Sequence, residues 1–351
     1  LLNIVYKLFT KTTCLRIQGV LSEAETEEQA GFLKGHSTID HVHTVKQVVE
    51  ASHEHNLPLF MLFIDFKKAF DSVECNAVWS ALTEQGVHPS IVNILQKMYE
   101  KANSVIQVNE CHVPIHIERG VRQGDTISPI LFTPCLRWVF AQLDWDNMGI
   151  KVAGRRLTHL AFADDIVLFA RRRVDIERMA TDLACIAKQS GLYMNTAKTL
   201  AMSNKTSRQA LAPITLPDGQ ISFVREFTYL GQHISCPLSQ AQETKRRIRA
   251  GWGAFSKYNS FLINKTVPMH NKRKIFNTCI LPAMIYGAET WVTLKTSLHA
   301  LGVAQRRMKR IMAVVTLRDR RTNEWLRGVT KVKDVRAVDS SKTPRISEEI
   351  S

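Results

Sequence analysis

The stretch from Leu160 to Phe169, L-A-F-A-D-D-I-V-L-F, constrains the fold of this chain more than any other. Two short apolar runs joined by a polar dipeptide predict a β-hairpin whose tight turn carries Asp164 and Asp165. Adjacent carboxylates between such apolar strands repel each other, so a compensating positive charge is needed. A divalent cation would supply it. The alternative is an ordinary solvated turn, because an isolated Asp-Asp pair is weak evidence of a site.

A second candidate acidic position follows another apolar run. Residues 58–64, P-L-F-M-L-F-I, have the length and composition of a central strand covered on both faces, and the run ends at Asp65. A carboxylate at the end of a buried strand is costly unless it is paired or binds a metal. Ser72 is predicted to cap a helix that runs to Gln85.

The segment E-R-G-V-R-Q-G-D-T-I-S-P-I-L-F, residues 118–132, has the features of a ligand-binding loop that leads into a helix. Glycines allow close approach of the backbone to a ligand, and the side chains between them offer donors. A packing turn is the alternative. The loop glycines, the donors and the Ser-Pro pair that begins the predicted helix are Gly120, Arg122, Gln123, Gly124, Ser128 and Pro129.

Charge and length indicate the class of partner. The chain has 351 residues, 45% of them hydrophobic, which is enough for two or three lobes. Its net charge of +15 predicts a polyanionic partner, with nucleic acid as the first candidate and an anionic membrane surface as the second. No apolar run approaches the roughly 20 residues of a membrane span. The seven cysteines form no C-x-x-C pair, which favours a reducing intracellular setting.

Helical patterns occur near both ends of the chain. Ser37 or Thr38 is predicted to cap a helix through about Ser52, and F-T-Y-L-G-Q-H-I-S at 227–235 is typical of a hairpin strand. From Gln240 onward the pattern is helical. Three basic clusters in this region favour a surface that tracks phosphates over merely solvated faces: 245–249, 272–274 and 306–310.

Asp65 and the Asp164–Asp165 pair together offer three carboxylates, which suit two Mg²⁺ ions. A two-metal site about 4 Å across activates an attacking 3′-hydroxyl and stabilises a leaving pyrophosphate. A carboxylate pair acting on sugars would explain neither the basic charge nor the glycine-bounded loop.

The motifs of this chain resemble, in the same order, the reverse transcriptases of non-LTR (LINE-like) retrotransposons, most closely the endonuclease-reverse transcriptases of the RTE-like group. The resemblance extends from the first residues to about residue 330. The matching stretches are L-L-N-I-V-Y-K-L-F-T-K, Q-A-G-F-x-K-G-x-S-T-x-D-H, F-I-D-F-K-K-A-F-D-S-V, R-G-V-R-Q-G-D-T-I-S-P-x-L-F, F-A-D-D, G-L-x-x-N-x-x-K-T, Y-L-G and L-P-A-M-I-Y-G-A-E-T-W.

The resemblance implies an α+β right-hand polymerase, with fingers, a palm built on an antiparallel sheet with helices on one face, and a helical thumb. Residues 1–236 would form fingers and palm, with the palm core at about 58–76 and 119–236. Residues 240–330 would form the thumb, and 331–351 a disordered tail. The implied activity is RNA-directed DNA synthesis from dNTPs on an RNA template and a DNA primer or target, with two Mg²⁺ ions or Mn²⁺ and no membrane. The implied locations are a cytoplasmic ribonucleoprotein and the nucleus.

The resemblance also assigns roles at the catalytic centre. Asp65, Asp164 and Asp165 match the metal-binding carboxylates, the first two as principal ligands. Phe70 matches the aromatic gate that excludes a 2′-hydroxyl, and Lys198 matches the lysine proposed to protonate the pyrophosphate.

Further implied roles concern the nucleotide, the primer and the nucleic-acid backbone. Phe66 and Lys67 would offer backbone N–H groups to the triphosphate. The nucleotide and template base would lie against Arg122, Gln123 and Gly124. The primer grip would be Tyr229, Leu230 and Gly231. The backbone-tracking residues would be Lys245, Arg246, Arg249, Lys272 and Arg273.

Departures from the family pattern favour a second hypothesis, a catalytically weak or inactive remnant that still binds nucleic acid. Leu33 stands where the fingers motif usually has arginine, with Lys34 as an imperfect substitute. Pro134 is expected to kink its helix or to cost about 3 kcal/mol. The endonuclease domain that the family implies upstream is not in this sequence. RNA-templated RNA synthesis is disfavoured by Phe70, because a gate for ribonucleotides would be small.

Overall fold

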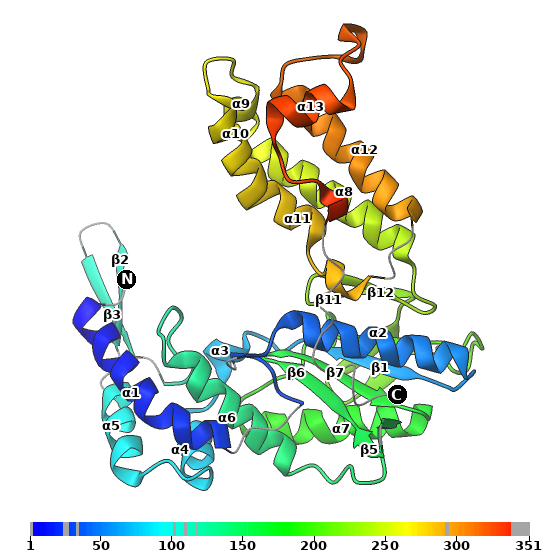
Figure 1. The fold of residues 1–351 in the computed structure, drawn as a ribbon. Coiled ribbons are helices and arrows are strands. Elements are labelled where there is room, and N and C mark those ends of the chain that lie inside the picture. Colours follow the sequence, from blue (N-terminus) through cyan, green and yellow to red (C-terminus); the bar gives the residue numbers. More distant parts are fainter. Residues whose placement is uncertain are drawn as a thin grey trace. The chain divides into compact units, whose positions relative to one another are not determined.

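The computed structural model divides into two compact units, which are described separately (Figure 1). The first unit contains residues up to 41 and residues 51–225, and the second contains residues 42–50 and those from 226 onward. The structure describes residues 3–23, 28–32, 35–100, 103–108, 111–116, 118–152, 154–291 and 295–337. Leu33, Lys34 and most of the predicted tail, residues 338–351, lie outside these ranges.

A six-stranded sheet forms the centre of the first unit. Its spatial order is β6-β7-β1-β8-β10-β9. All neighbours are antiparallel except β8 and β10, so the sheet departs from the expected antiparallel palm at this one pair. Every residue of β1 is buried, as predicted for a central strand. The strands are β1 (Phe60–Ile64), β6 (His159–Phe162), β7 (Asp165–Ala170), β8 (Leu200–Ser203), β9 (Ile214–Leu216) and β10 (Gly219–Phe223).

Helices and two hairpins complete this unit. Helix α7 packs against β1, β7 and α6, and it buries apolar side chains at helical spacing on that face. The helices are α1 (Ile4–Glu23), α2 (Thr38–Glu54), α3 (Ala69–Ser72), α4 (Cys75–Glu84), α5 (Pro89–Glu100), α6 (Ser128–Ala141) and α7 (Arg173–Gln189). The hairpins are β2–β3 (Asn103–Val108, Cys111–His116) and β4–β5 (Ile150–Val152, Arg155–Leu157). The middle of α2 belongs to the second unit.

The predicted helix starts are confirmed in one case and wrong in another. Ser37 caps α2 and forms a capping box with Asp40. Ser72, in contrast, ends the short helix α3 and caps nothing, because α4 begins at Cys75 with Glu74 at its N-cap position. Pro134 lies inside α6, which continues to Ala141, so the proline does not end the helix.

The second unit is a helical domain with one hairpin. Its strands are β11 (Glu226–Tyr229) and β12 (Gln232–Ser235). Its helices are α8 (Gln240–Lys257), α9 (Asn259–Ile263), α10 (Met269–Ile275), η1 (Phe276–Ile280), α11 (Leu281–Ile285), η2 (Ala288–Thr290), α12 (Lys295–Met312), η3 (Leu317–Asp319), α13 (Asn323–Thr330) and η4 (Val335–Ala337). Phe276, Met284 and Met308 are fully buried in its core. Across the described ranges, no helix has the length and apolar character of a membrane span.

Buried His41 makes the first unit sensitive to acid. Its ring is 3% exposed and meets Phe162 edge-on at 6.0 Å, and this burial lowers the pKa of His41 to about 4. The unfolded chain binds a proton near pH 6.5, so stability is lost as the pH falls from about 6.5 towards 4. We expect the contribution of His41 to fall by about 2 kcal/mol between pH 7.5 and pH 5.

Urea unfolding at both pH values tests this expectation. His41→Phe should lose less stability on acidification than the parent, whereas His53→Gln, at an exposed histidine, should behave as the parent does. An equal loss in His41→Phe and parent would show that His41 is not held neutral by folding.

Candidate active site

Asp65 and Asp165 lie at the ends of two neighbouring strands. The register of β1 and β7 pairs Ile64 with Ile166, so the next residues along the two strands are Asp65 and Asp165. Directly opposite residues of an antiparallel pair direct their side chains to the same face. Asp164 occupies the two-residue turn between β6 and β7, which the pairing of Phe162 with Asp165 closes. The predicted hairpin is therefore confirmed, but its turn is Ala163–Asp164, and Asp165, which was predicted to lie in the turn, is the first residue of β7.

The turn that carries Asp164 is held by a segment more than 130 residues away. Residues 28–30 run along β6, where Ala161 N–H donates to Glu28 O (2.8 Å) and Ala30 N–H donates to Ala161 O (3.1 Å). Gly31 then packs on the backbone of Ala163 with no room for a Cβ. Ala163 itself has φ +58°, a conformation that costs an L-residue about 1–2 kcal/mol. Sequence reasoning missed this support, although the glycine of Q-A-G-F was its signal.

A loop after α7 surrounds Asp65. Asn195 Nδ2 donates to Asp65 Oδ2 at 3.0 Å, and Asn195 N–H donates to the Asp65 carbonyl at 2.7 Å. Lys198 Nζ is 3.9 Å from Asp65 Oδ2, and its side chain is 71% exposed. Lys198, predicted as the general acid for the pyrophosphate, therefore lies beside this carboxylate, and its role stays a prediction. Asn195 orients Asp65, and the sequence marked it only as part of a motif.

Burial and two neighbouring carboxylates act on Asp165. Loss of hydration, followed by the charges of Asp164 and Asp65, raises the pKa of Asp165 to about 6. A divalent cation would relieve this repulsion, and the hard oxygen donors fit Mg²⁺ or Mn²⁺. Within the described ranges, no three His, Cys, Asp or Glu side chains enclose a common point where an ion could bind. The three-carboxylate ligand set therefore stays a prediction.

Phe70 lies in an aromatic cluster. Its ring stacks on Phe132 with centroids 4.5 Å apart and meets Phe32 edge-on at 6.4 Å. The loop 118–124 docks beside it, because Val121 N–H donates to the Phe70 carbonyl at 2.7 Å.

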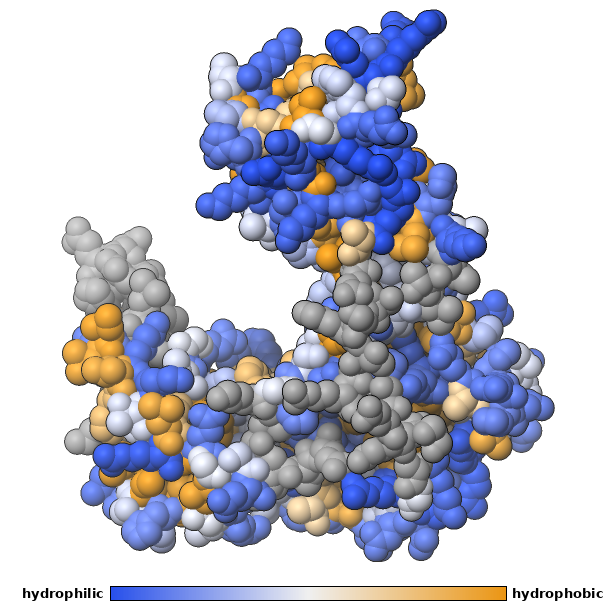
Figure 2. All heavy atoms as spheres, in the orientation of Figure 1, coloured by the Kyte–Doolittle hydropathy of each residue, from blue (hydrophilic) through white to orange (hydrophobic). Residues whose placement is uncertain are grey.

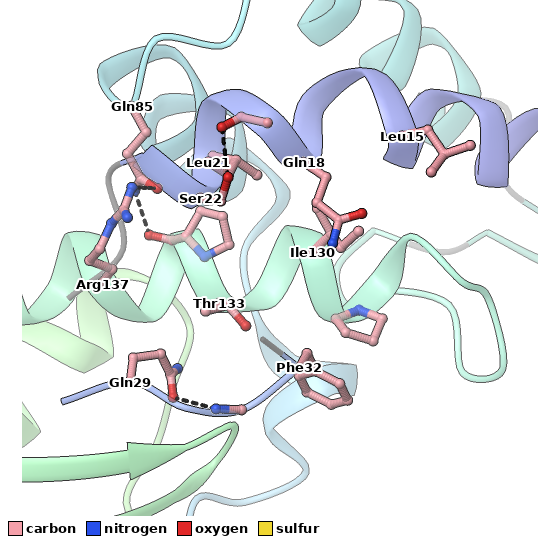
Figure 3. Close-up of a pocket in the computed structure, with 14 residues that line it drawn as sticks. Leu15, Gln18, Leu21, Ser22, Gln29, Phe32, Gln85, Ile130, Thr133 and Arg137 are labelled. Atoms are coloured by element: carbon pink, nitrogen blue, oxygen red, sulfur yellow. Dashed lines mark hydrogen bonds between the residues drawn. The ribbon is translucent and has the colours of Figure 1, made fainter. Parts of the chain in front are cut away.

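Phe32 also lines a cavity of about 410 Å³ between α1 and α6, where Gln18 and Ile130 lie on the opposite wall (Figure 3).

Two groups that were predicted to contact the nucleotide donate hydrogen bonds to backbone carbonyls of the protein. Arg122 donates to the Met98 carbonyl at 3.1 Å, and its guanidinium lies over the rings of Tyr6 (4.8 Å) and Tyr99 (5.3 Å). The Lys67 N–H donates to the Tyr193 carbonyl at 2.8 Å. In this conformation the Lys67 N–H and one Arg122 N–H bind distant segments of the protein, and the nucleotide-binding roles of both residues stay predictions.

The remaining predicted contacts are divided between core and surface. Gln123, Gly124 and the Lys67 side chain are exposed, whereas Phe66 is buried. In the second unit the predicted primer grip is the turn of the β11–β12 hairpin. The three carboxylates belong to the first unit.

Five basic residues of the second unit were predicted to follow a nucleic-acid backbone. Lys245 and Arg249 are exposed one turn apart on α8, and Arg273 is half-buried. The prediction for Lys272 is wrong, because this residue is 3% exposed and its Nζ donates to the Met312 carbonyl at 3.0 Å. Arg246 is also not free, because its guanidinium donates to the Gly231 carbonyl. Figure 2 shows a mostly hydrophilic surface over this unit in one view.

Comparison with known proteins gives a consistent result. The family described as reverse transcriptase (RNA-dependent DNA polymerase) matches residues 1–234. An uncharacterized transposon-derived protein of Caenorhabditis elegans is 30% identical over 200 residues, 56% of this chain and 68% of that protein. The probable RNA-directed DNA polymerase from transposon BS of Drosophila melanogaster is 25% identical over 324 residues, 88% of this chain and 35% of that protein.

The chain spans about a third or less of the longer relatives that it matches. The Pol polyprotein of the Drosophila melanogaster retrotransposable element R2DM is 30% identical over 181 residues, 50% of this chain and 17% of that protein. Among solved structures, apo telomerase from Candida tropicalis has a TM-score of 0.51 at 12% identity and covers 87% of this chain and 54% of its own. This likeness concerns the fold alone, and it confirms the expected α+β right-hand polymerase fold.

Proposed function

Because this chain belongs to the reverse transcriptase (RNA-dependent DNA polymerase) family, we propose that it adds dNTPs to a DNA 3′ end on an RNA template by two-metal phosphoryl transfer. The observation that carries the proposal is the placement of Asp65 and Asp165 at adjoining strand ends, with Asp164 in the turn and Lys198 Nζ 3.9 Å from Asp65. Such a set suits a reaction in which negative charge builds up on phosphate oxygens.

Each residue of the site has a defined part in the proposal. Asp65 and Asp164, with Asp165, would hold two Mg²⁺ ions, which when bound supply charge neutralisation for the attacking and leaving oxygens. Asn195 keeps the Asp65 carboxylate in place through its 3.0 Å hydrogen bond. Lys198 holds the proton for the pyrophosphate, and its 71% exposure leaves the ammonium free to move towards that group. Phe70 restricts the sugar to one without a 2′-hydroxyl.

The internal hydrogen bond of Arg122 favours the alternative, a catalytically weak or inactive remnant that binds nucleic acid. A guanidinium held between two tyrosine rings must be released before it can contact a nucleotide. Exposed Lys245 and Arg249 would retain phosphate contacts in such a remnant.

Narrower assignments are also proposed. The motif order supports the RTE-like group, whose members carry an endonuclease ahead of the polymerase. RNA template, DNA primer or target and dNTPs are the proposed partners, in a cytoplasmic ribonucleoprotein and then in the nucleus. Fingers and palm at 1–236 and thumb at 240–330 are the proposed domains.

Primer extension on poly(rA)/oligo(dT) with Mg²⁺ and dTTP tests the function. We expect extension by the parent, no extension with chelator, and binding of the same duplex that weakens steeply with salt because counterions are released. Binding with a steep salt dependence but no extension would establish the remnant instead. Absence of both would contradict both hypotheses.

A further inference from the structure

The motif L-P-A-M-I-Y-G-A-E-T-W, residues 281–291, has no role in the catalytic site, yet its tyrosine contacts the predicted primer grip. Tyr286 OH donates to the Leu230 carbonyl at 2.9 Å. The Tyr286 carbonyl in turn accepts from Gln232 Nε2 at 2.6 Å. The segment that follows α11 is therefore bonded on both sides of the β11–β12 turn, and all of these residues lie in the second unit.

The turn needs such support because its backbone is unfavourable. Tyr229 pairs with Gln232, so Leu230 and Gly231 form a two-residue turn with φ +44° and +76°. Asn-Gly is the usual choice for this turn, whereas a leucine in the left-handed region is strained. Residues in such conformations persist where the surrounding structure over-determines them, typically at functional sites. The Tyr286 ring packs close to Gly231, where an added Cβ would lie 3.2 Å from it.

A buried ion pair fixes the second carbonyl of the turn. The guanidinium groups of Arg246 and Arg247 both donate to the Gly231 carbonyl. Arg247 also pairs with Glu243 at 2.5 Å and lies over the Tyr286 ring at 5.1 Å. Glu243 is 2% exposed and accepts the His233 N–H at 2.8 Å. Strand β12 and both turn carbonyls are thus attached to α8 and the Tyr286 segment.

Lys46 of α2 closes the network from a distant part of the chain. Its side chain is buried, and Nζ donates to Thr290 Oγ1 at 2.9 Å and to Gln232 Oε1 at 3.3 Å. Gln232 therefore connects Lys46 to the Tyr286 carbonyl through its two amide atoms. The end of the 281–291 motif cannot move without breaking these bonds.

We propose that Tyr286, with Arg247, is a positioning residue that holds the Leu230–Gly231 turn in the conformation in which it contacts the DNA primer. The inference rests on the proposed polymerase function for the identity of the ligand. The contacts by which Tyr286 fixes the turn do not depend on whether the protein is an active polymerase. The L-P-A-M-I-Y-G-A-E-T-W motif thereby acts on the primer end of the reaction without touching the reacting atoms.

Tyr286→Phe tests the proposal, because it removes only the hydroxyl that bonds to Leu230. Tyr258→Phe is the matched control, at a tyrosine of the same unit that lies at the C-terminal end of α8. We expect faster amide hydrogen exchange in residues 226–235 of Tyr286→Phe and an unchanged rate in Tyr258→Phe. We also expect the KM for poly(rA)/oligo(dT) to rise about fivefold, with the KM for dTTP unchanged.

The outcomes separate the inference from the function. Unchanged hairpin exchange in Tyr286→Phe would overturn the inference, whether or not the parent extends primers. Faster exchange with an unchanged KM for the template–primer would show that the turn, although fixed by Tyr286, does not contribute to binding of the primer. A lower kcat alone, with both KM values unchanged, would indicate a merely structural role. A parent that does not extend would refute the proposed function, and hydrogen exchange would still decide whether Tyr286 fixes the turn.

Discussion

Asp65→Asn is expected to lower primer extension at least about 10³-fold, the largest effect of any substitution considered. Asparagine keeps the size of the side chain and an oxygen that accepts the 3.0 Å hydrogen bond from Asn195. The fold should therefore survive, and only the charge is lost. Asp164→Asn should have a comparable effect, because an amide is a weak ligand for Mg²⁺.

Asp71→Asn is the matched control for this prediction. It makes the same chemical change six residues further along, at an exposed aspartate of α3. Single-turnover extension rates and unfolding midpoints should be measured for all three variants. Wild-type rates in Asp65→Asn would remove this residue from the catalytic centre, and an equal loss in Asp71→Asn would point to a general charge effect.

Phe70→Ala is expected to reduce discrimination against ribonucleotides about 10²-fold, through a gain in rNTP incorporation. The effect depends on the rigidity of the ring, which Phe132 stacks on at 4.5 Å and Phe32 meets edge-on. Removing the ring opens space for a 2′-hydroxyl. It also leaves a small void, so we expect a loss of about 2 kcal/mol in unfolding free energy.

The ratio of kcat/KM for dTTP and rUTP is the decisive measurement. Phe223→Ala controls for the loss of a partly buried phenylalanine of the same unit, one that meets Phe60 of β1 edge-on. Its discrimination should match that of the parent. Unchanged discrimination in both Phe70→Ala and Phe70→Val would show that Phe70 is not the gate.

Local patterns were sufficient to predict the β6–β7 hairpin that carries Asp164. The apolar runs on either side of Asp164 have the period and length of strands, and residues 60–64 are buried throughout, as a continuous apolar run predicts. The sequence predicted a cap at Ser37 or Thr38, and the structure has Ser37 as the cap, in a capping box with Asp40 three residues later. Ser72 failed as a cap because Lys68, with φ +49°, starts an earlier turn of helix that uses Ser72 as its end.

Local sequence patterns could not predict contacts between distant segments of the chain. Lys272 has the same chemistry as its exposed neighbour Lys274, and only the fold shows that its ammonium meets the end of α12. Arg122 lies in a loop that looks solvent-facing, yet α1 and α5 supply the tyrosine rings that hold it. In both cases a partner far along the chain decides whether a cation is free, and periodicity carries no information about that partner.

The shared helix α2 has a consequence for how the protein is made. Lys46 precedes its partners Gln232 and Thr290 by 186 and 244 residues. At ribosomal rates of about 5–20 residues per second, Thr290 is synthesised about 10–50 s after Lys46. During that interval the lysine has to stay hydrated while every strand of the six-stranded sheet emerges. A protease that cuts between residues 50 and 226 during this interval would separate residues 42–50 from the rest of the second unit.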